Sequence, residues 1–286
     1  YCAVTNNELH MLLLYSIHSS SFDITSYLLT VVDLDDINKP NEMRDETSRL
    51  VTHTLLSLAV AKNDTQTVQL LLQQPNIDKN CIVTNKGETA FFIAVNSQSL
   101  DVVKLLLQDP DIDINKPRFD NVTPLHTAAY QSYYDGFTAL VNSGRMLDLN
   151  VKSKCNRTAI YAASRYGDYE NVECIVQYAM KNDIILDIYT EGEEGTPLEA
   201  AIKHDYISVF HYLTFYKKNV LEKNKSSTTT SATSATSATS ATELPPTPPS
   251  TKPYTFHPLS LGDILSCIDT ICADSSLFTN RDIVNK

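Results

Sequence analysis

The chain has 286 residues, of which 42% are hydrophobic, and it carries a formal net charge of −11. A chain of this length buries a substantial core, whereas its excess of carboxylates repels phosphate backbones and anionic membrane surfaces. We therefore expect a folded protein that binds no nucleic acid and does not insert into a membrane, since no apolar run approaches the roughly 20 residues of a spanning helix.

The first element expected along the chain is a pair of helices over residues 11–16 and 24–29, where apolar residues recur at helical spacing. An insertion around residues 41–50 separates this pair from the next segment. That segment begins at Thr54, 43 residues after Met11, which occupies the corresponding position of the first pair. We expect Met11 to replace the capping threonine of the later copies.

Five similar segments occur in the chain, and their first threonines are spaced by 35, 34, 35 and 38 residues. The segments begin at Thr54, Thr89, Thr123, Thr158 and Thr196. A second apolar stretch starts fourteen residues after each threonine, at Val68, Val103, Phe137, Val172 and Phe210. Two anchors that stay in register over five copies identify an internal repeat.

Each copy has the pattern of two short helices and a polar connector. Thr123 followed by Pro124 is typical of a helix N-cap and first helical position, because the hydroxyl accepts an unpaired amide and proline has none. A large and a small residue three apart, Leu125 and Ala128, share one helical face and allow close approach of a neighbour. One pair cannot bury its apolar faces alone, so the copies must stack.

The TPLH start at 123–126, the leucine-rich second helix and the DIN turn at 113–115 resemble ankyrin repeats. The resemblance covers residues 8–218, with the full motif only at 123–129. It implies an all-α, helix-turn-helix repeat solenoid with short β-hairpin-like connectors, which occupies residues 1–222 with about six repeats, the first one degenerate.

Glycines, which this family usually places in its turns, are few. The chain has seven, and Asn121 and Asn156 occupy the position of Gly87 in later repeats. Asparagine tolerates left-handed backbone angles, so we expect both residues to act as turn residues there.

Residues 223–256 are expected to form a disordered linker, because this Ser/Thr/Ala/Pro-rich stretch has almost no bulky side chains to bury. An alternative is a regulated peptide, since residues 245–248 read Pro-Pro-Thr-Pro, which suits a polyproline-reading domain. Thr247 would then be a site for a proline-directed phosphate.

Beyond the linker, residues 257–286 are expected to hold a short helix or a degenerate repeat. The residues at helical spacing are Leu261, Ile264, Leu265, Ile268, Ile271 and Cys272. A repeat array needs its last apolar face covered, and the second helix of the last clear repeat, 209–216, is rich in aromatic residues. We therefore expect residues 258–273 to fold back onto it or to begin another repeat.

Catalytic and metal-binding motifs are absent from the sequence, so we expect no enzyme activity, no cofactor and no metal site. Resemblance to the family implies that His126 is structural, with hydrogen bonds between neighbouring repeats. The pair Glu193 and Glu194 is expected to be solvated charge in a loop. Six cysteines without CxxC spacing indicate free thiols in a reducing compartment, so we expect an intracellular protein of the cytoplasm, with the nucleus as the alternative.

In this family, partners usually meet the concave side, which consists of hairpin tips and the inward ends of the first helices. The candidate partner-binding residues are Phe119, Asp120, Tyr130, Gln131, Lys154, Arg157, Arg165 and Tyr166. Aromatic and arginine side chains are enriched in interface hot spots. The alternative interpretation is a set of scattered surface aromatics with an intrachain cation–π contact.

The favoured function is that of a scaffold that binds another protein through this concave face, and the acidic body favours a partner with a basic surface. The alternative is a targeting or regulatory module of a larger protein, such as an enzyme, a ubiquitin-ligase component or a channel. The start at Tyr1, without an initiator methionine, makes us expect a fragment.

Overall fold

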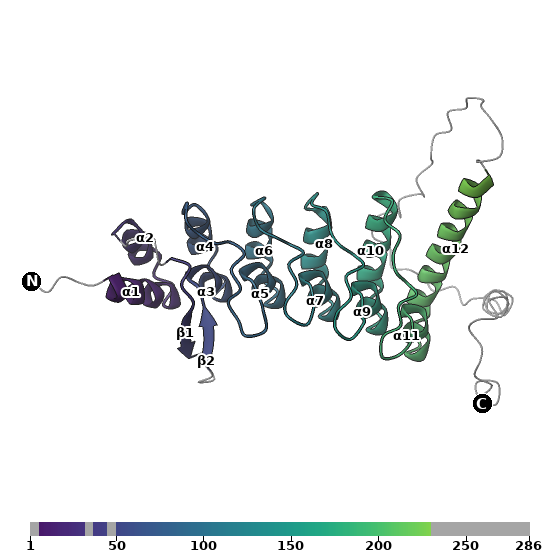
Figure 1. Ribbon diagram of the computed structural model, residues 1–286, viewed down its shortest axis with the longest axis horizontal. Helices are drawn as coiled ribbons and strands as arrows, with labels where there is room; N and C mark the ends of the chain where they lie inside the picture. The colour runs from purple at the N-terminus through teal and green to yellow at the C-terminus, as the bar shows by residue number, and fades with distance from the viewer. Residues whose placement is uncertain (1–5, 32–36, 45–49, 230–286) are drawn as a thin grey trace, which may run out of the picture. The chain divides into compact units, whose positions relative to one another are not determined.

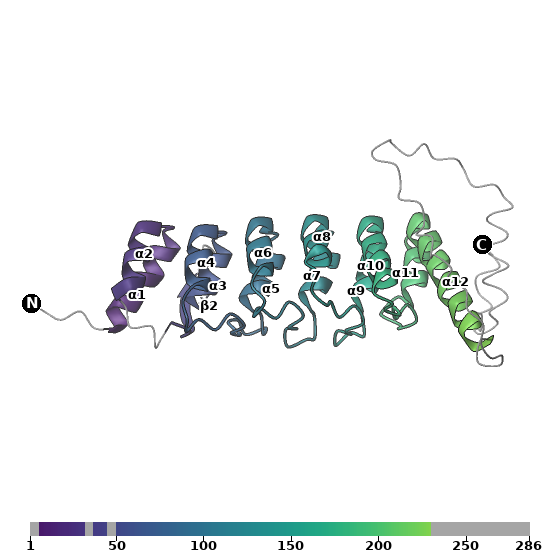
Figure 2. The ribbon, with the colours of Figure 1, turned by 90° about the horizontal axis from the view of Figure 1, so that it is seen from above.

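Six pairs of antiparallel helices succeed one another along the chain in a computed structural model that describes residues 6–31, 37–44 and 50–229 (Figure 1). The first helices of the pairs are α1 (Asn6–His18), α3 (Leu55–Ala61), α5 (Ala90–Asn96), α7 (Pro124–Tyr130), α9 (Ala159–Arg165) and α11 (Pro197–Lys203). The second helices are α2 (Phe22–Val31), α4 (Thr65–Leu72), α6 (Leu100–Leu107), α8 (Tyr134–Asn142), α10 (Tyr169–Lys181) and α12 (Ile207–Thr229). First helices pack against first helices and second helices against second helices, in two layers that Figure 2 shows from above. The prediction of a helix-turn-helix repeat solenoid is confirmed.

The predicted threonine caps are present at all five clear repeats. The side chain of each threonine accepts a hydrogen bond from the backbone amide three residues on, at Thr54, Thr89, Thr123, Thr158 and Thr196. Pro124 and Pro197 lie at the first position of their helices, where no amide bond is lost.

The turn between the two helices of each pair contains one residue in the left-handed conformation. These residues are Ser20, Asn63, Gln98, Ser132, Gly167 and Asp205, with φ between 50° and 69°. Their identical placement fixes the register of the six pairs, and it shows that only the fifth pair uses glycine there. The prediction that Asn121 and Asn156 act as left-handed turn residues is confirmed. Their φ angles are 63° and 56°, at the position where Gly87 has a φ of 88°.

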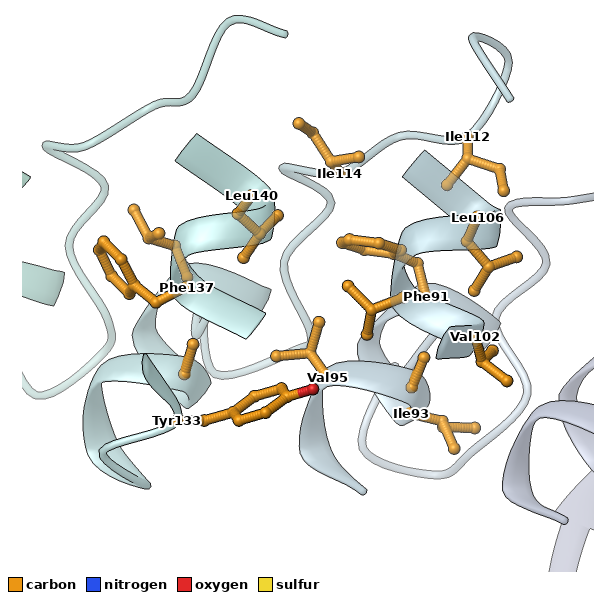
Figure 3. Packing of buried hydrophobic residues seen from close by; sticks show 14 of the residues in the cluster. Phe91, Ile93, Val95, Val102, Leu106, Ile112, Ile114, Tyr133, Phe137 and Leu140 are labelled. Carbon is orange, nitrogen blue, oxygen red and sulfur yellow. The ribbon is translucent and has the colours of Figure 1, made fainter. Parts of the chain in front are cut away.

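A continuous apolar core runs between the two layers. Figure 3 shows part of it: Phe91 and Val95 of α5 and Leu106 of α6 lie beside Phe137 and Leu140 of the next pair, and all five are buried. Burial of one such side chain is worth about 1.5–3 kcal/mol. Because each pair exposes both flanks to its neighbours, this stabilisation depends on stacking.

The connectors are joined by a second, polar set of contacts, which we call the asparagine ladder. In Asn38, Asn80, Asn115 and Asn150, the amide nitrogen donates to a carbonyl of the next connector and the amide oxygen accepts from a backbone amide two residues further on, at 2.6–3.1 Å. Each asparagine side chain thus makes the two hydrogen bonds to the next connector that a paired backbone would otherwise make. Sequence patterns alone indicated only turn residues here.

The insertion after the first pair forms a two-stranded antiparallel sheet of β1 (Asn41–Arg44) and β2 (Leu50–His53). The strands pair Asn41 with His53, directly before α3. In Figure 1 this hairpin projects on the same side as the shorter connectors of the later pairs. The insertion is therefore an extended version of the hairpin-like connector.

Two helix ends differ from what the sequence pattern indicates. Helix α12 continues to Thr229 and crosses the boundary predicted after residue 222, because no glycine or proline interrupts the chain there. Helix α1 begins at Asn6, so Met11 lies inside the helix and is not its cap. The remainder of the linker, the tract around Thr247 and the C-terminal segment 257–286 lie outside the described residues.

Candidate interaction surface

The tips of the connectors before α5, α7 and α9 form a row that is fixed by backbone hydrogen bonds. One bond closes each tip, as from Arg118 N to the Val122 carbonyl at 3.0 Å. Two more bonds join neighbouring tips, from Phe119 N to the Lys86 carbonyl and from Lys154 N to the Asp120 carbonyl, both at 2.8 Å. The predicted residues Phe119, Asp120 and Lys154 therefore lie next to one another.

Phe119 and Lys154 present their side chains to solvent on this row. The Phe119 ring is exposed and lies over Gly87, where an added Cβ would come within 2.8 Å of it. Lys86 and Lys154 are also exposed, and neither ammonium group takes part in a salt bridge with the part of the chain that the structure describes. The tips thus carry one exposed aromatic ring between two unpaired cations.

Asp120, in contrast, is an intrachain partner. Its two carboxylate oxygens accept hydrogen bonds from Arg118 at 2.7 and 2.6 Å, a bidentate geometry. These bonds lower the pKa of Asp120. Arg118 also lies 3.6 Å from Glu88. Both carboxylates near the tips are therefore already paired.

The ends of α7 and α9 bring the predicted Tyr130, Arg165 and Tyr166 together. The rings of Tyr130 and Tyr166 meet edge to face with centroids 5.9 Å apart, and the Arg165 guanidinium lies 5.9 Å from the Tyr166 centroid. Arg157 Nη1 donates to the Tyr130 hydroxyl at 3.3 Å. Of these four side chains, only Tyr166 is exposed, and burial raises the pKa of Tyr130. The intrachain cation–π contact of the alternative interpretation is present.

The carboxylates Glu193 and Glu194 close this cluster. The prediction of solvated charge is wrong for Glu194, whereas the Glu193 side chain is 56% exposed. Glu193 pairs with Arg157, while Glu194 lies 3.1 Å from Arg165 Nε and 2.7 Å from His204 Nε2. The Glu194 side chain is only 13% exposed. The hydrogen bond from His204, together with those from Arg165 and Lys203, lowers the pKa of Glu194 to about 2. Adjacent acidic residues in a loop gave no signal for these partners, which lie in the connector before α9, in α9 itself and at the end of α11.

Gln131 joins two repeats and is not a free surface group. Its amide nitrogen donates to the backbone carbonyl and to the side-chain oxygen of Asn96, both at 3.1 Å. The C-terminal ends of α5 and α7 are thereby held together. Gln131 thus positions the surface.

His126 also joins two repeats, as expected. Its Nε2 lies 2.9 Å from the Arg157 carbonyl, and its Nδ1 is 3.3 Å from the amide of Thr123, which can only donate. These contacts require the neutral ring with its proton on Nε2. Burial lowers the pKa of His126, which favours that neutral form. A catalytic role is not needed to explain this residue.

Comparison with known proteins places this geometry in a family. Residues 56–153 and 125–224 match the family model for ankyrin repeats, described as three copies. The chain belongs to the ankyrin repeat family. The crystal structure of the ankyrin repeat domain of Bcl-3, titled a unique member of the IkappaB protein family, is similar with a TM-score of 0.58 and 18% sequence identity. The match covers 72% of this chain and 85% of that chain. No curated protein matches.

Ankyrin repeats are protein–protein interaction modules, and the fold is in general not catalytic. The residues that the structure describes contain no cluster of three His, Cys, Asp or Glu side chains that could hold a metal ion. Within the same residues, no helix has the length and apolarity to cross a membrane.

Proposed function

We propose that the chain binds a protein partner through the concave side of repeats three to five, with Phe119, Lys154 and Tyr166 as contacting side chains. The observation that supports this most is their exposure on a backbone that neighbouring repeats hold fixed. Of the other predicted residues, Asp120, Tyr130, Gln131, Arg157 and Arg165 take part in intrachain contacts and act as positioning residues.

Fixed positions favour binding, because a surface that is already ordered loses little conformational entropy when a partner docks. Tyr166 is held between the Tyr130 ring and the Arg165 guanidinium, and Phe119 lies on the tip of its neighbour at Gly87. Exposed aromatic rings with such support resemble the residues that dominate protein interfaces.

The charge of this surface differs from that of the whole chain. The net charge of −11 favours a basic partner, but Asp120, Glu193 and Glu194 are paired with cations of the same chain. Lys86 and Lys154 are the exposed charges on the tips that form no salt bridge with the described residues of the chain. We therefore infer a partner segment with an apolar side chain for Phe119 and acidic or neutral groups around it, in place of the basic surface that the composition favours.

The experiment is affinity capture with the full chain and identification by mass spectrometry, comparing the wild type with a Phe119→Ala/Tyr166→Ala double variant. We expect the double variant to weaken capture of the specific partner by about 100-fold or more, since a hot-spot aromatic is worth about 2 kcal/mol. Met146→Ala is the matched control, because Met146 is exposed in the turn after α8 and away from the tips. Equal capture by all three proteins would place the binding surface elsewhere.

Replacing Tyr130, Arg165 and Tyr166 together is a less informative test. Tyr130 bonds with Arg157, and Arg165 pairs with Glu194, so their removal also loosens the contact between repeats. The double variant removes two exposed rings and leaves these contacts in place.

A further inference from the structure

We propose that the second-helix layer carries another binding surface, which takes an arginine-rich segment of a partner protein. This surface, which we call the tyrosine–carboxylate patch, consists of Tyr134, Tyr169, Glu170, Glu173 and Tyr212. These residues lie on α8, α10 and α12, which are neighbours in the second-helix layer (Figure 1). The patch shares no residue with the concave surface described above, so the two proposals are independent.

The aromatic part of the patch comes from three consecutive second helices. Tyr134 and Tyr169 are the first residues of α8 and α10, and they are 40% and 37% exposed. Both helices have a helix pair on each side, so this exposure does not arise at an end of the stack. The Tyr169 ring meets the Tyr212 ring edge to face, with centroids 5.5 Å apart. In α4 and α6 the same first position holds Thr65 and Leu100, which are partly buried. Exposed rings at this position therefore distinguish α8 and α10.

The two carboxylates of the patch have no cationic partner in the same chain. Glu170 is exposed and Glu173 is partly buried, and neither forms a salt bridge within residues 6–31, 37–44 and 50–229. Glu173 Oε1 accepts a hydrogen bond from the neutral Gln177 side chain at 3.1 Å. Burial, followed by the charge of Glu170, raises the pKa of Glu173. Part of the net charge of −11 is therefore available to a partner here, unlike at the concave surface.

The rings and carboxylates form one cluster across the three helices. The Cys174 thiol, burial and the charges of Glu170 and Glu173 together raise the pKa of Tyr134 on the neighbouring α8. On the other side, burial and the charge of Glu173 raise the pKa of Tyr212 to about 12. A charge acts on a ring hydroxyl in this way only at short distance. The carboxylates of α10 thus lie near a ring of α8 and a ring of α12.

The protein itself shows which cation fits a ring beside a carboxylate. Arg118 lies 5.5 Å from the Phe92 centroid, and Arg165 lies 5.9 Å from the Tyr166 centroid. Both arginines also pair with a carboxylate of the same chain. A guanidinium is planar, stacks on an aromatic face and binds a carboxylate through two donors, whereas an ammonium is a point charge. The patch offers the same combination of ring and carboxylate, and an arginine of a partner completes it.

Helix α6 provides a matched comparison for the charge of the patch. Asp101 is followed by Lys104 in α6, whereas Glu170 is followed by Glu173 at the same positions of α10. A carboxylate in the first turn also favours each helix through the helix dipole. Asp101→Asn therefore removes a dipole contribution of the same kind without changing the patch.

The test measures binding of a fluorescein-labelled peptide of alternating arginine and glycine to the full chain, by fluorescence anisotropy at about 0.15 M salt. We expect saturable binding that Glu170→Gln/Glu173→Gln weakens by about tenfold or more, because both carboxylate contacts are lost. Asp101→Asn should bind the peptide within about twofold of the wild type. Equal losses in the two proteins would overturn the proposal, as would the absence of binding to the wild type.

A second variant and a second peptide test the role of the rings. Tyr134→Leu/Tyr169→Leu should also weaken binding by about tenfold, and leucine suits these positions because Leu100 begins α6. A peptide with lysine in place of arginine should bind the wild type about threefold more weakly or worse, because lysine stacks less well on the rings. Equal affinity for both peptides would mean that only the net charge of the chain attracts them, which contradicts an arginine-specific patch.

Backbone amide NMR shifts during the arginine-peptide titration locate the bound peptide. The largest shifts should occur at the starts of α8 and α10. The exposed connector aspartates Asp78, Asp113 and Asp148 are the competing acidic surface. Largest shifts at these aspartates, or at the connector tips around Phe119, would place the peptide elsewhere and overturn the proposal.

Discussion

Neighbouring repeats of this protein are held together by different contacts in the helix layers and in the connectors. Between the layers, contact is apolar and non-directional, as with Phe91, Phe137 and Leu140. Between the connectors, it is polar and directional, with the asparagine ladder and His126 each making bonds at fixed geometry. Burial thus supplies most of the stability, whereas the connector bonds determine where the tips and their exposed side chains lie.

The largest expected effect comes from the layers. Phe137→Ala removes a fully buried ring from α8 and leaves a cavity against α6 and α10, so the free energy of unfolding should fall by about 3–5 kcal/mol. Urea denaturation monitored by circular dichroism measures this change. A loss below about 1 kcal/mol would contradict the claim that apolar burial in the helix layers supplies most of the stability.

A smaller loss is expected in the connectors. Asn115→Ala removes the bonds to the Met146 carbonyl and the Asp148 amide, which should cost about 1–2 kcal/mol in the same assay. Asn142→Ala is the matched control, because Asn142 is exposed and should change stability by less than about 0.5 kcal/mol. Equal effects of the two substitutions would show that the ladder is not stabilising.

Acid should weaken the connector contact at His126. Its pKa in the folded chain lies below the ordinary value of 6.5, so the unfolded chain binds the proton first as pH falls. Neutral His126 therefore stabilises the folded chain fully above pH 6.5. This stabilisation is lost as the pH falls below 6.5, by up to about 1.4 kcal/mol per pH unit. His126→Gln keeps a donor and an acceptor without titrating, so its stability between pH 7 and 5 should fall less steeply. Parallel pH curves for the two proteins would assign the acid sensitivity to other groups.

The smallest effect is expected in the turns within the pairs. Ser132 has a φ of 50° and is exposed, so Ser132→Gly should raise stability by up to about 1 kcal/mol by relieving a left-handed conformation. Gly167→Ala should do the opposite, because its φ is 69° and an added Cβ would meet the Tyr206 ring. Thermal melts of both variants measure these shifts, and a destabilised Ser132→Gly would contradict the strain argument.

The sequence predicts the layers better than the connectors for a physical reason. Helix caps and apolar spacing are local patterns, so Thr123 and Phe137 are sufficient to place their helices. Contacts of the connectors join residues about 31–40 positions apart, as from Asn115 to Met146 or from Asn38 to Asp78. No local pattern encodes which carbonyl an asparagine will reach.

The same distinction explains the candidate surface. The spacing of the sequence motif places Phe119 at a connector tip and Tyr130 and Tyr166 at the ends of first helices, because the motif recurs once in every helix pair. It gives no information on which charges are paired, since the partners of Glu193 and Glu194 lie on other elements. The net charge of the chain therefore indicated a basic partner for a surface whose own carboxylates are neutralised.

Residue-resolved amide hydrogen exchange of the full chain tests most directly whether the connectors hold the proposed partner-binding residues in place. The structure predicts slow exchange at the Phe119 and Lys154 amides, which donate to the Lys86 and Asp120 carbonyls of neighbouring tips. Exchange of both amides at the rate of an unprotected loop would contradict the claim that the partner surface is preformed.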